Sequence, residues 1–296
     1  MTSTPFSTLR DLLRYAVTRF NGAGLAFGHG SANAFDEAAY LVLHTLGLPL
    51  DKLDPFLDAR LLPDEIEKVM QVIERRARDR EPAAYITNEA WLGNYRFYVD
   101  SRAIVPRSFL AELIPDFFPP SIMNPDGGDR VLHLCPGSGC LPIMRADVFP
   151  NARIDAVDIS PDALEVARRN VADYDLQDRI RLIESDLYAN LPQDGPYDLI
   201  VCNPPYVNSA SMERLPQEYR HEPRIALAGG DDGMDLVRRI VAGAGERLTG
   251  NGLLVVEVGH ERGHAEAAFP ERELTWLSTS AGDDMVFLLT AEQLRA

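Results

Sequence analysis

One stretch decides the fold: Asp198-Leu199-Ile200-Val201-Cys202-Asn203-Pro204-Pro205-Tyr206, an apolar run that stops at an amide, two prolines and a phenol. Such a run, bounded by breakers, predicts a strand that is covered on both faces in a parallel sheet. Ligands of parallel sheets bind at the carboxyl ends of the strands, where Asn203 would stand. Pro204 and Pro205 have fixed φ angles and no backbone donor, so the carbonyl groups beside them are held stiffly. The stretch therefore predicts a rigid group of hydrogen-bond acceptors at the edge of the sheet.

The tetrapeptide from Asn203 to Tyr206 offers acceptors and an aromatic face but no evident acid, base or metal ligand. A planar amino or amide nitrogen that must be aimed at an electrophile would need these groups. An ordinary proline turn after a strand could have the same sequence, so the motif by itself leaves both interpretations open.

The composition predicts a soluble protein of two domains. The chain has 296 residues, enough for a large α/β domain and a smaller one, and it is 46% hydrophobic and 25% charged. No stretch has the apolar length that spans a bilayer, and residues 1–10 lack the pattern of a secretory signal. Three cysteines fit a reducing compartment better than a disulfide framework. We therefore expect a cytoplasmic protein that does not enter a membrane.

The net charge is −16, and lysine occurs only at Lys52 and Lys68. Proteins that follow a phosphate backbone are normally basic, so this balance argues against stable nucleic-acid binding. An acidic surface can steer a basic protein partner towards a site. The alternative is that the acidity serves solubility alone.

The first part of the chain has apolar residues at helical spacing, over residues 9–20, 35–46 and 63–77. This spacing predicts a helical domain over residues 1–84. Between residues 82 and 106 the pattern changes to alternation around aromatic residues, which predicts a β-hairpin. We assign residues 85–118 to this hairpin linker and residues 119–296 to the second domain, which begins with a loop rich in proline and glycine.

The second domain alternates between strand and helix patterns. Besides the strand that ends at Asn203, strands are predicted at residues 130–134, 153–157, 180–183, 253–258 and 284–289. Helices are predicted between them, the last over residues 235–248. This alternation is typical of a doubly wound parallel α/β sheet.

A glycine loop, Cys135-Pro136-Gly137-Ser138-Gly139-Cys140, follows the first of these strands. Its small residues would let the backbone approach a ligand at the start of the next helix. Asp158 ends the next strand, where a carboxylate can accept hydrogen bonds from ribose hydroxyls, and Asp186 follows the third strand, where it could hold the amine of an adenine. These three sites outline an adenosyl pocket. A capping turn at Asp158 and a surface turn at Asp186 are the alternatives.

Two other cofactors are considered for the same loop. A nicotinamide dinucleotide would fit it, but no hydride-transfer partner stands near Asn203. A metal could be suspected from His133, Cys135 and Cys140, but no second pair of ligands follows them. The tetrapeptide from Asn203 to Tyr206 resembles the signature of amino methyltransferases, and this resemblance favours sulfonium chemistry.

With these motifs in place, the chain resembles the protein glutamine methyltransferases over nearly its whole length. The resemblance rests on the glycine loop, Asp158 and the tetrapeptide after the strand, and on further matches at Val105-Pro106-Arg107 and Gly229-Gly230-Asp231-Asp232-Gly233. It implies a Rossmann-like class I methyltransferase fold of seven strands, the last antiparallel. It also implies methyl transfer from S-adenosylmethionine, with S-adenosylhomocysteine as the product and no metal.

The resemblance also implies roles for individual residues. Asn203 and the Pro204 carbonyl would accept the two amide protons of the target glutamine, and Tyr206 would pack beside it. The residues implied for cofactor binding are His133, Cys135, Gly137, Gly139, Asp158, Asp186 and Asn203, and those for substrate binding are Arg107, Pro205 and Glu222. Two positions depart from the family pattern, because His133 replaces an acidic residue and Pro136 a threonine.

The resemblance favours one branch of the family, which acts on ribosomal protein L-three of the large subunit. The segments that match this branch include Gly28-His29-Gly30 and Glu218-Tyr219-Arg220-His221-Glu222-Pro223. Three alternatives remain. They are a methyltransferase of peptide release factors, a nucleic-acid adenine methyltransferase, and a cofactor-binding assembly factor without catalysis.

Overall fold

The computed structural model describes residues 6–114 and 129–296, so the predicted loop over residues 119–128 lies outside the described residues. The chain divides into two compact units. A helical unit comprises Met1–Ala90 and Pro216–His221, and a second unit, named the catalytic unit after the predicted catalytic residues that it contains, comprises Trp91–Leu215 and Glu222–Ala296. The proposed domain limit at residue 84 falls inside the helix Ala83–Thr87. The return of residues 216–221 to the helical unit is a feature that local sequence patterns do not indicate.

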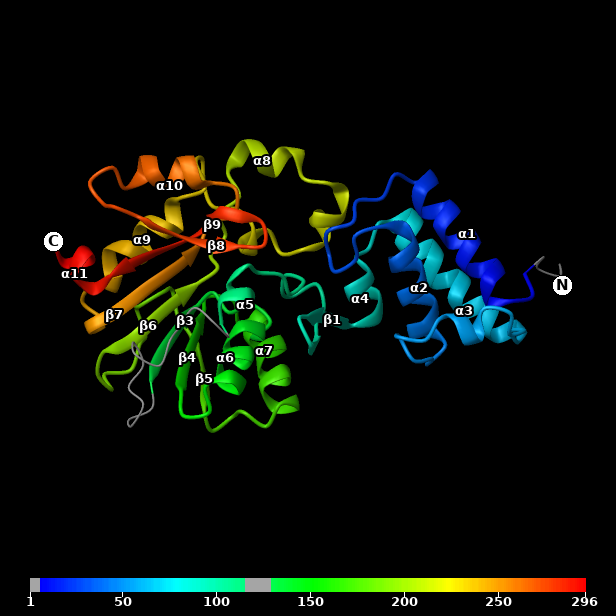
Figure 1. Ribbon diagram of the computed structural model, residues 1–296, viewed down its shortest axis with the longest axis horizontal. Helices are drawn as coiled ribbons and strands as arrows, with labels where there is room; N and C mark the ends of the chain where they lie inside the picture. Colours follow the sequence, from blue (N-terminus) through cyan, green and yellow to red (C-terminus); the bar gives the residue numbers. More distant parts are fainter. Residues whose placement is uncertain (1–5, 115–128) are drawn as a thin grey trace. The chain divides into compact units, whose positions relative to one another are not determined.

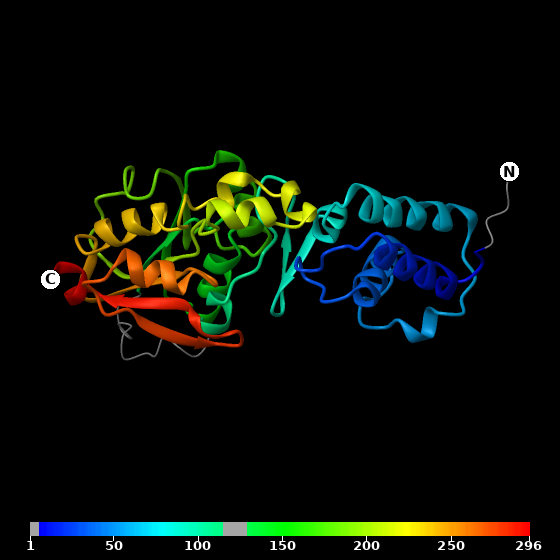
Figure 2. The ribbon, with the colours of Figure 1, turned by 90° about the horizontal axis from the view of Figure 1, so that it is seen from above.

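The helical unit contains the three predicted helices, as α1 (Leu9–Gly22), α2 (Ala34–Thr45) and α3 (Pro63–Glu74). Thr8 and Asn33 accept hydrogen bonds from the first turns of α1 and α2, and Pro63 starts α3. The three helices pack on one another through a shared apolar core, as the blue and cyan helices of Figure 2 show. The unit is completed by η1 (Asp54–Phe56), the π-helical η2 (Arg75–Asp79), α4 (Ala83–Thr87) and η3 (Gln217–His221).

A two-stranded sheet of β1 (Glu89–Leu92) and β2 (Tyr95–Tyr98) confirms the predicted hairpin. The catalytic unit contains a second sheet of seven strands in the order β5-β4-β3-β6-β7-β9-β8. Its strands are β3 (Arg130–Leu134), β4 (Arg153–Asp158), β5 (Ile180–Glu184), β6 (Tyr197–Cys202), β7 (Leu248–Glu257), β8 (Thr275–Thr279) and β9 (Gly282–Thr290).

The prediction of a doubly wound sheet with an antiparallel last strand is confirmed. Strands β3 to β7 pair in parallel, and β9 runs antiparallel to both of its neighbours. Two details of the prediction were wrong. The strand β8 was missed, and the helix predicted over residues 235–248 ends at Ala244, because Leu248 already belongs to β7.

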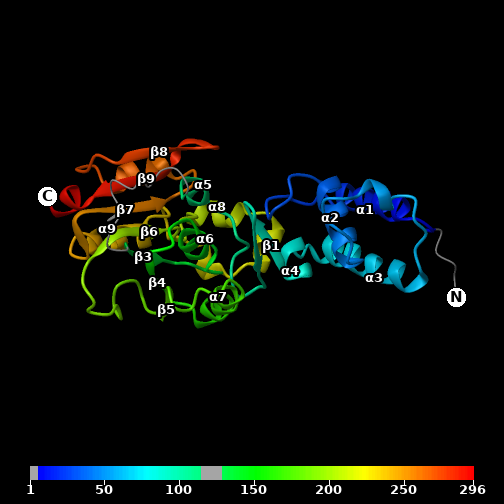
Figure 3. The same ribbon diagram turned by 60° about the horizontal axis from the view of Figure 1, so that its bottom comes forward.

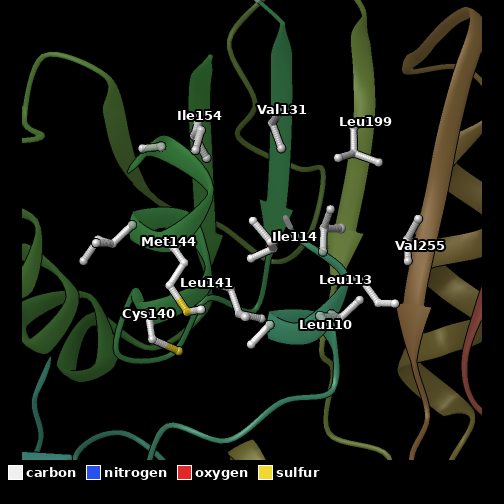
Figure 4. Packing of buried hydrophobic residues seen from close by; sticks show 14 of the residues in the cluster. Leu110, Leu113, Ile114, Val131, Cys140, Leu141, Met144, Ile154, Leu199 and Val255 are labelled. Carbon is white, nitrogen blue, oxygen red and sulfur yellow. The ribbon is translucent and has the colours of Figure 1, made fainter. Parts of the chain in front are cut away.

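Helices cover both faces of the sheet (Figures 1 and 3). One face packs against α5 (Leu110–Leu113), α6 (Cys140–Val148) and α7 (Pro161–Asp173). The other packs against α9 (Asp235–Ala244), α10 (Arg262–Ala268) and α11 (Ala291–Arg295). Figure 4 shows Leu110 and Leu113 of α5 turned towards the strands that carry Leu199 and Val255. The core therefore fixes α5 beneath β6 and β7.

The order of the strands places the site. From β3 the chain passes to β4 and β5 on one side, and it then returns to place β6 on the other side of β3. Ligands of such sheets bind where the strand order reverses, beyond the carboxyl ends of the strands. The glycine loop after β3, Asp158 at the end of β4 and Asn203 after β6 all stand at that edge.

Candidate active site

A cavity of about 310 Å³ opens at this edge, entirely within the catalytic unit. It is lined on one side by the predicted adenosyl residues and on the other by the loop after β6. Of the predicted site residues, those that line it are Cys135, Gly137, Asp158, Asp186, Asn203 and Pro205. The remaining predicted residues, His133, Gly139, Pro204, Tyr206, Arg107 and Glu222, are outside the lining as the described chain outlines it.

The glycine loop takes backbone conformations that explain its composition. Gly137 and Gly139 have φ angles of +54° and +80°, which glycine adopts without strain. A Cβ atom on Gly139 would also lie 3.2 Å from the Cβ of Ala167, so a side chain there would press on α7. Gly139 therefore supports the loop from behind, at the start of α6, whereas Gly137 faces the cavity.

Asp158 links the loop to the end of β4. Its Oδ2 accepts a hydrogen bond from the Gly137 amide at 3.2 Å, and its Oδ1 accepts one from the Ser160 amide at 3.0 Å. Burial raises the pKa of this carboxyl above its usual value, although these amides act against the shift. A carboxylate oxygen can accept more than one hydrogen bond, so Asp158 retains acceptor capacity towards the cavity.

Asp186 also lines the cavity but is exposed. Its carboxylate forms an ion pair with Arg239 of α9, with a distance of 2.8 Å between Oδ2 and the guanidinium nitrogen. An adenine amine at this place would share Asp186 with that arginine.

The loop after β6 is closed by glycines of a later segment. The Val207 amide donates to the Leu227 carbonyl at 2.9 Å, and the Gly229 amide donates to the Val207 carbonyl at 2.9 Å. A Cβ atom on Gly229 would lie 2.8 Å from the Pro205 carbonyl oxygen. The glycine cluster of residues 229–233 thus lets its backbone pack directly against the backbone of residues 205–207. This packing supports the proline turn.

Asn203 and Tyr206 each have a defined neighbour. The Nδ2 of Asn203 donates to the Arg107 carbonyl at 3.5 Å, which directs the side-chain oxygen of Asn203 away from that carbonyl. The Tyr206 hydroxyl donates to Oε1 of Glu257 at 3.5 Å. A Cβ atom on Gly259 would lie 2.7 Å from the Tyr206 ring, so the ring rests directly on that glycine.

Arg107 and Glu222, which were predicted to bind the substrate, form an ion pair with each other. The guanidinium of Arg107 donates to both oxygens of Glu222, at 2.6 and 2.7 Å. The Val105 amide also donates to Glu222 at 3.0 Å. This fully buried carboxylate therefore holds the segment from Val105 to Arg107 in place. The Arg107 carbonyl of this segment accepts the hydrogen bond from Asn203.

His133 was predicted to contact the cofactor, but its ring is buried beneath α6. It lines a much smaller cavity with Leu141 and Arg145, and its Nδ1 has no hydrogen-bond partner among the described residues. Burial lowers the pKa of His133 to about 3, so the imidazole is neutral. An uncharged ring cannot supply the negative charge that the acidic residue of the family pattern would carry.

Sequence reasoning missed Glu257, the last residue of β7. It lies on the sheet beside the strand that leads to Asn203, because Val256 pairs with Cys202. The signal was visible, since Glu257 is a charged residue inside the otherwise apolar run of residues 253–258.

Two kinds of feature are absent from the described residues. No group of three or more His, Cys, Asp and Glu side chains in residues 6–114 and 129–296 is arranged to hold a metal ion. No helix in these same ranges has the length and apolar character needed to cross a membrane.

Comparisons with known proteins identify what this chain is similar to. A family model described as the methyltransferase small domain matches residues 120–218. A ribosomal protein uL3 glutamine methyltransferase from Burkholderia pseudomallei is 60% identical over 99% of this chain and 97% of its own length. One from Neisseria meningitidis serogroup B is 58% identical over 97% of this chain and 94% of its own length.

A solved structure shares the fold. The hMettl16 catalytic domain in complex with MAT2A 3'UTR hairpin 1 matches with a TM-score of 0.50 at 13% identity, covering 94% of this chain and 90% of that chain. At this identity the match concerns the fold alone.

Proposed function

The chain belongs to the family of the ribosomal protein uL3 glutamine methyltransferases, and on that premise we propose that it methylates the side-chain amide nitrogen of a glutamine in ribosomal protein uL3, with S-adenosylmethionine as the methyl donor. One observation supports this most strongly. A single cavity is lined by Gly137 and Asp158 on one side and by Asn203 and Pro205 on the other, so a cofactor and an amide could meet in it.

The residues present suit S-adenosylmethionine. Asp158 has acceptor capacity for ribose hydroxyls, the Gly137 backbone borders the cavity, and the Asp186 carboxylate could take the adenine amine in competition with Arg239. His133 would act only through the loop, because it lies outside the cavity lining. When bound, S-adenosylmethionine supplies an electrophilic methyl group on a sulfonium.

The amide of glutamine is a weak nucleophile and gains most from being held in the reactive orientation. We assign this task to the Asn203 side-chain oxygen and the Pro204 carbonyl, each accepting one amide proton. These acceptors favour electron density on the nitrogen as it attacks. Tyr206 would pack beside the amide, and Pro205 would border its path. Arg107 and Glu222 would contribute by fixing the turn next to Asn203.

The net charge of −16 supports a basic protein as the partner and disfavours stable nucleic-acid binding. A glutamine side chain is too small to be selected by itself, so recognition needs a second contact area. We assign that area to the helical unit, whose described residues include none of those that line the cavity.

The test is a methylation assay with purified protein, S-adenosylmethionine labelled at the methyl group, and three separate acceptors: ribosomal protein uL3, a peptide release factor and ribosomal RNA. We expect label only in the ribosomal protein, and tandem mass spectrometry should place one added methyl on a glutamine. Label in the release factor or in the RNA would overturn the substrate assignment. The Asn203→Ala variant serves as the inactive control.

A further inference from the structure

Glu257 ends the central strand β7 with a carboxylate that is 2% exposed. Because Val256 is paired with Cys202, Glu257 stands next to Asn203 across the sheet edge. Its side chain shares a sheet face with Val255, which packs against α5 and α6. Figure 4 shows α5 lying along that face.

The contacts of this carboxylate reach both flanks of Asn203. Its Oε2 accepts hydrogen bonds from the Ser108 hydroxyl and, at 3.3 Å, from the Leu110 amide. Its Oε1 accepts one from the Tyr206 hydroxyl at 3.5 Å. Ser108 directly follows Arg107, whose carbonyl receives the Nδ2 of Asn203. Tyr206 ends the proline turn that Asn203 begins.

We propose that Glu257 is a positioning residue for methyl transfer, whose carboxylate holds Tyr206 on one side and the turn from Arg107 to Leu110 on the other, so that the amide of Asn203 is fixed between them. The proposal rests on the proposed function. It adds to that function a residue that neither touches the cavity nor belongs to the motif after β6.

Stability alone does not account for this carboxylate. The groups that act on its charge are the Ser108 hydroxyl, the amides of Phe109 and Leu110, the Tyr206 hydroxyl, and the thiols of Cys140 on α6 and Cys202 on β6. On β9 the paired residue is Val286. Burial raises the pKa of Glu257 to about 7, since these uncharged donors offset only part of the lost hydration. A buried charge that no cation of the described residues neutralises costs stability, whereas the ionised form is the stronger acceptor for these hydroxyl and amide donors.

Two consequences follow for catalysis. The ionised form should be the active one, so kcat should fall as the pH decreases through about 7. In addition, removal of the charge and removal of the Tyr206 hydroxyl should not add, because both break the same contact.

The experiment measures methylation of ribosomal protein uL3 by the wild type, Glu257→Gln, Tyr206→Phe and the double variant between pH 6 and 9. A matched control is Glu246→Gln, whose carboxylate is 87% exposed. We expect Glu257→Gln to lower kcat by a factor of about ten or more, to leave KM for S-adenosylmethionine within about twofold, and to remove the limb near pH 7. The double variant should be no slower than the slower single variant.

An inactive wild type would refute the proposed function and not this inference specifically. An active wild type accompanied by a fully active Glu257→Gln, or by a Glu257→Gln that keeps the pH limb, would overturn the positioning role. Additive losses in the double variant would also overturn it. Should Glu257→Gln not fold, Ser108→Ala removes a different contact of the same carboxylate and should lower kcat as well. A Ser108→Ala variant with unchanged kcat would then overturn the proposal.

Discussion

The helical unit and the catalytic unit each enclose a carboxylate, but the partners of the two are of opposite kinds. In the helical unit, Glu218 accepts from Arg80 at 2.6 Å and from the Ala26 amide at 3.0 Å, and Arg76 stands 3.6 Å away. Burial pushes the pKa of Glu218 upwards, but the Ala26 amide and Arg80 outweigh it and hold the pKa below its usual value. In the catalytic unit, Glu257 has hydroxyl and amide donors, and its pKa is raised to about 7.

This comparison indicates that burial of a charge does not by itself mark a functional residue. A carboxylate matched by arginines is neutralised and ties together the segments that supply them. A carboxylate left with uncharged donors costs stability, and its retention needs a reason outside folding. The ion cluster of Glu218 joins residues 216–221 to the rest of the helical unit, whereas Glu257 joins the two flanks of Asn203.

The largest expected effect concerns the ion cluster. Replacing Glu218 by Ala leaves Arg80 without this partner, and it leaves Arg76 with the Glu37 carboxylate, whose Oε1 is 2.5 Å from Arg76 Nε, and with the Ala26 carbonyl. Breaking a buried pair costs about 3–5 kcal/mol, and urea unfolding should show this loss. Affinity for S-adenosylmethionine should not change, because the cavity belongs to the other unit. Glu213→Ala on the exposed face of α8 (Ser209–Arg214) is the control, and equal stability of the two variants would refute the structural role.

Asn203→Ala tests the opposite unit. If Asn203 orients the substrate amide, its loss should lower kcat by about 10²–10³-fold, equivalent to about 2.7–4 kcal/mol, which is typical for a lost transition-state contact. The melting temperature and the affinity for S-adenosylmethionine should stay near those of the wild type. Calorimetry with S-adenosylmethionine checks the second point. A parallel loss of cofactor affinity would move Asn203 from the substrate side to the cofactor side.

The two carboxylates should also respond to pH with opposite signs. The folded-state pKa of Glu257 is raised, so the free energy of unfolding of the wild type declines as the pH rises from about 4.5 to about 7. Glu257→Gln should remove this decline, which amounts to a free energy on the order of 1–3 kcal/mol at pH 8. The folded-state pKa of Glu218 is lowered, so its contribution is present above the unfolded value and disappears as the pH falls through the folded value. Glu218→Gln should therefore destabilise the protein at pH 8. Melting curves from pH 4 to 8 measure both, and shifts of the same sign at pH 8 would break the comparison.

The sequence predicted the parts of the site that depend on local pattern. The apolar run before Asn203, the glycine loop and Asp158 each carry their own signal, and parallel strands bring them to one edge of the sheet. For the same reason the hairpin and six of the seven strands of the large sheet followed from periodicity.

The contacts that the sequence did not predict join residues far apart in the chain. Glu257 meets Ser108 across 149 positions, and Glu218 meets Ala26 across 192, and neither pairing has a local signature. His133 is the converse case. Its place in a motif suggested contact with the cofactor, but the alternation of side chains along β3 turns it under α6, away from the residues that line the cavity.

The smallest expected effect concerns the association rate with the substrate protein and how strongly each unit contributes to its salt dependence. With a net charge of −16, the chain should attract a basic protein over a distance that shrinks as the Debye length falls from about 30 Å at 0.01 M salt to about 8 Å at 0.15 M. Stopped-flow association with ribosomal protein uL3 should therefore slow by several-fold over this range, while dissociation changes little.

Exposed acidic residues of each unit can be compared through Glu67→Gln on α3 and Glu213→Gln on α8. If the helical unit receives the substrate, Glu67→Gln should reduce the salt dependence more than Glu213→Gln does. A salt-independent rate would show that charge does not guide the encounter, and a larger effect of Glu213→Gln would place the first contact on the catalytic unit.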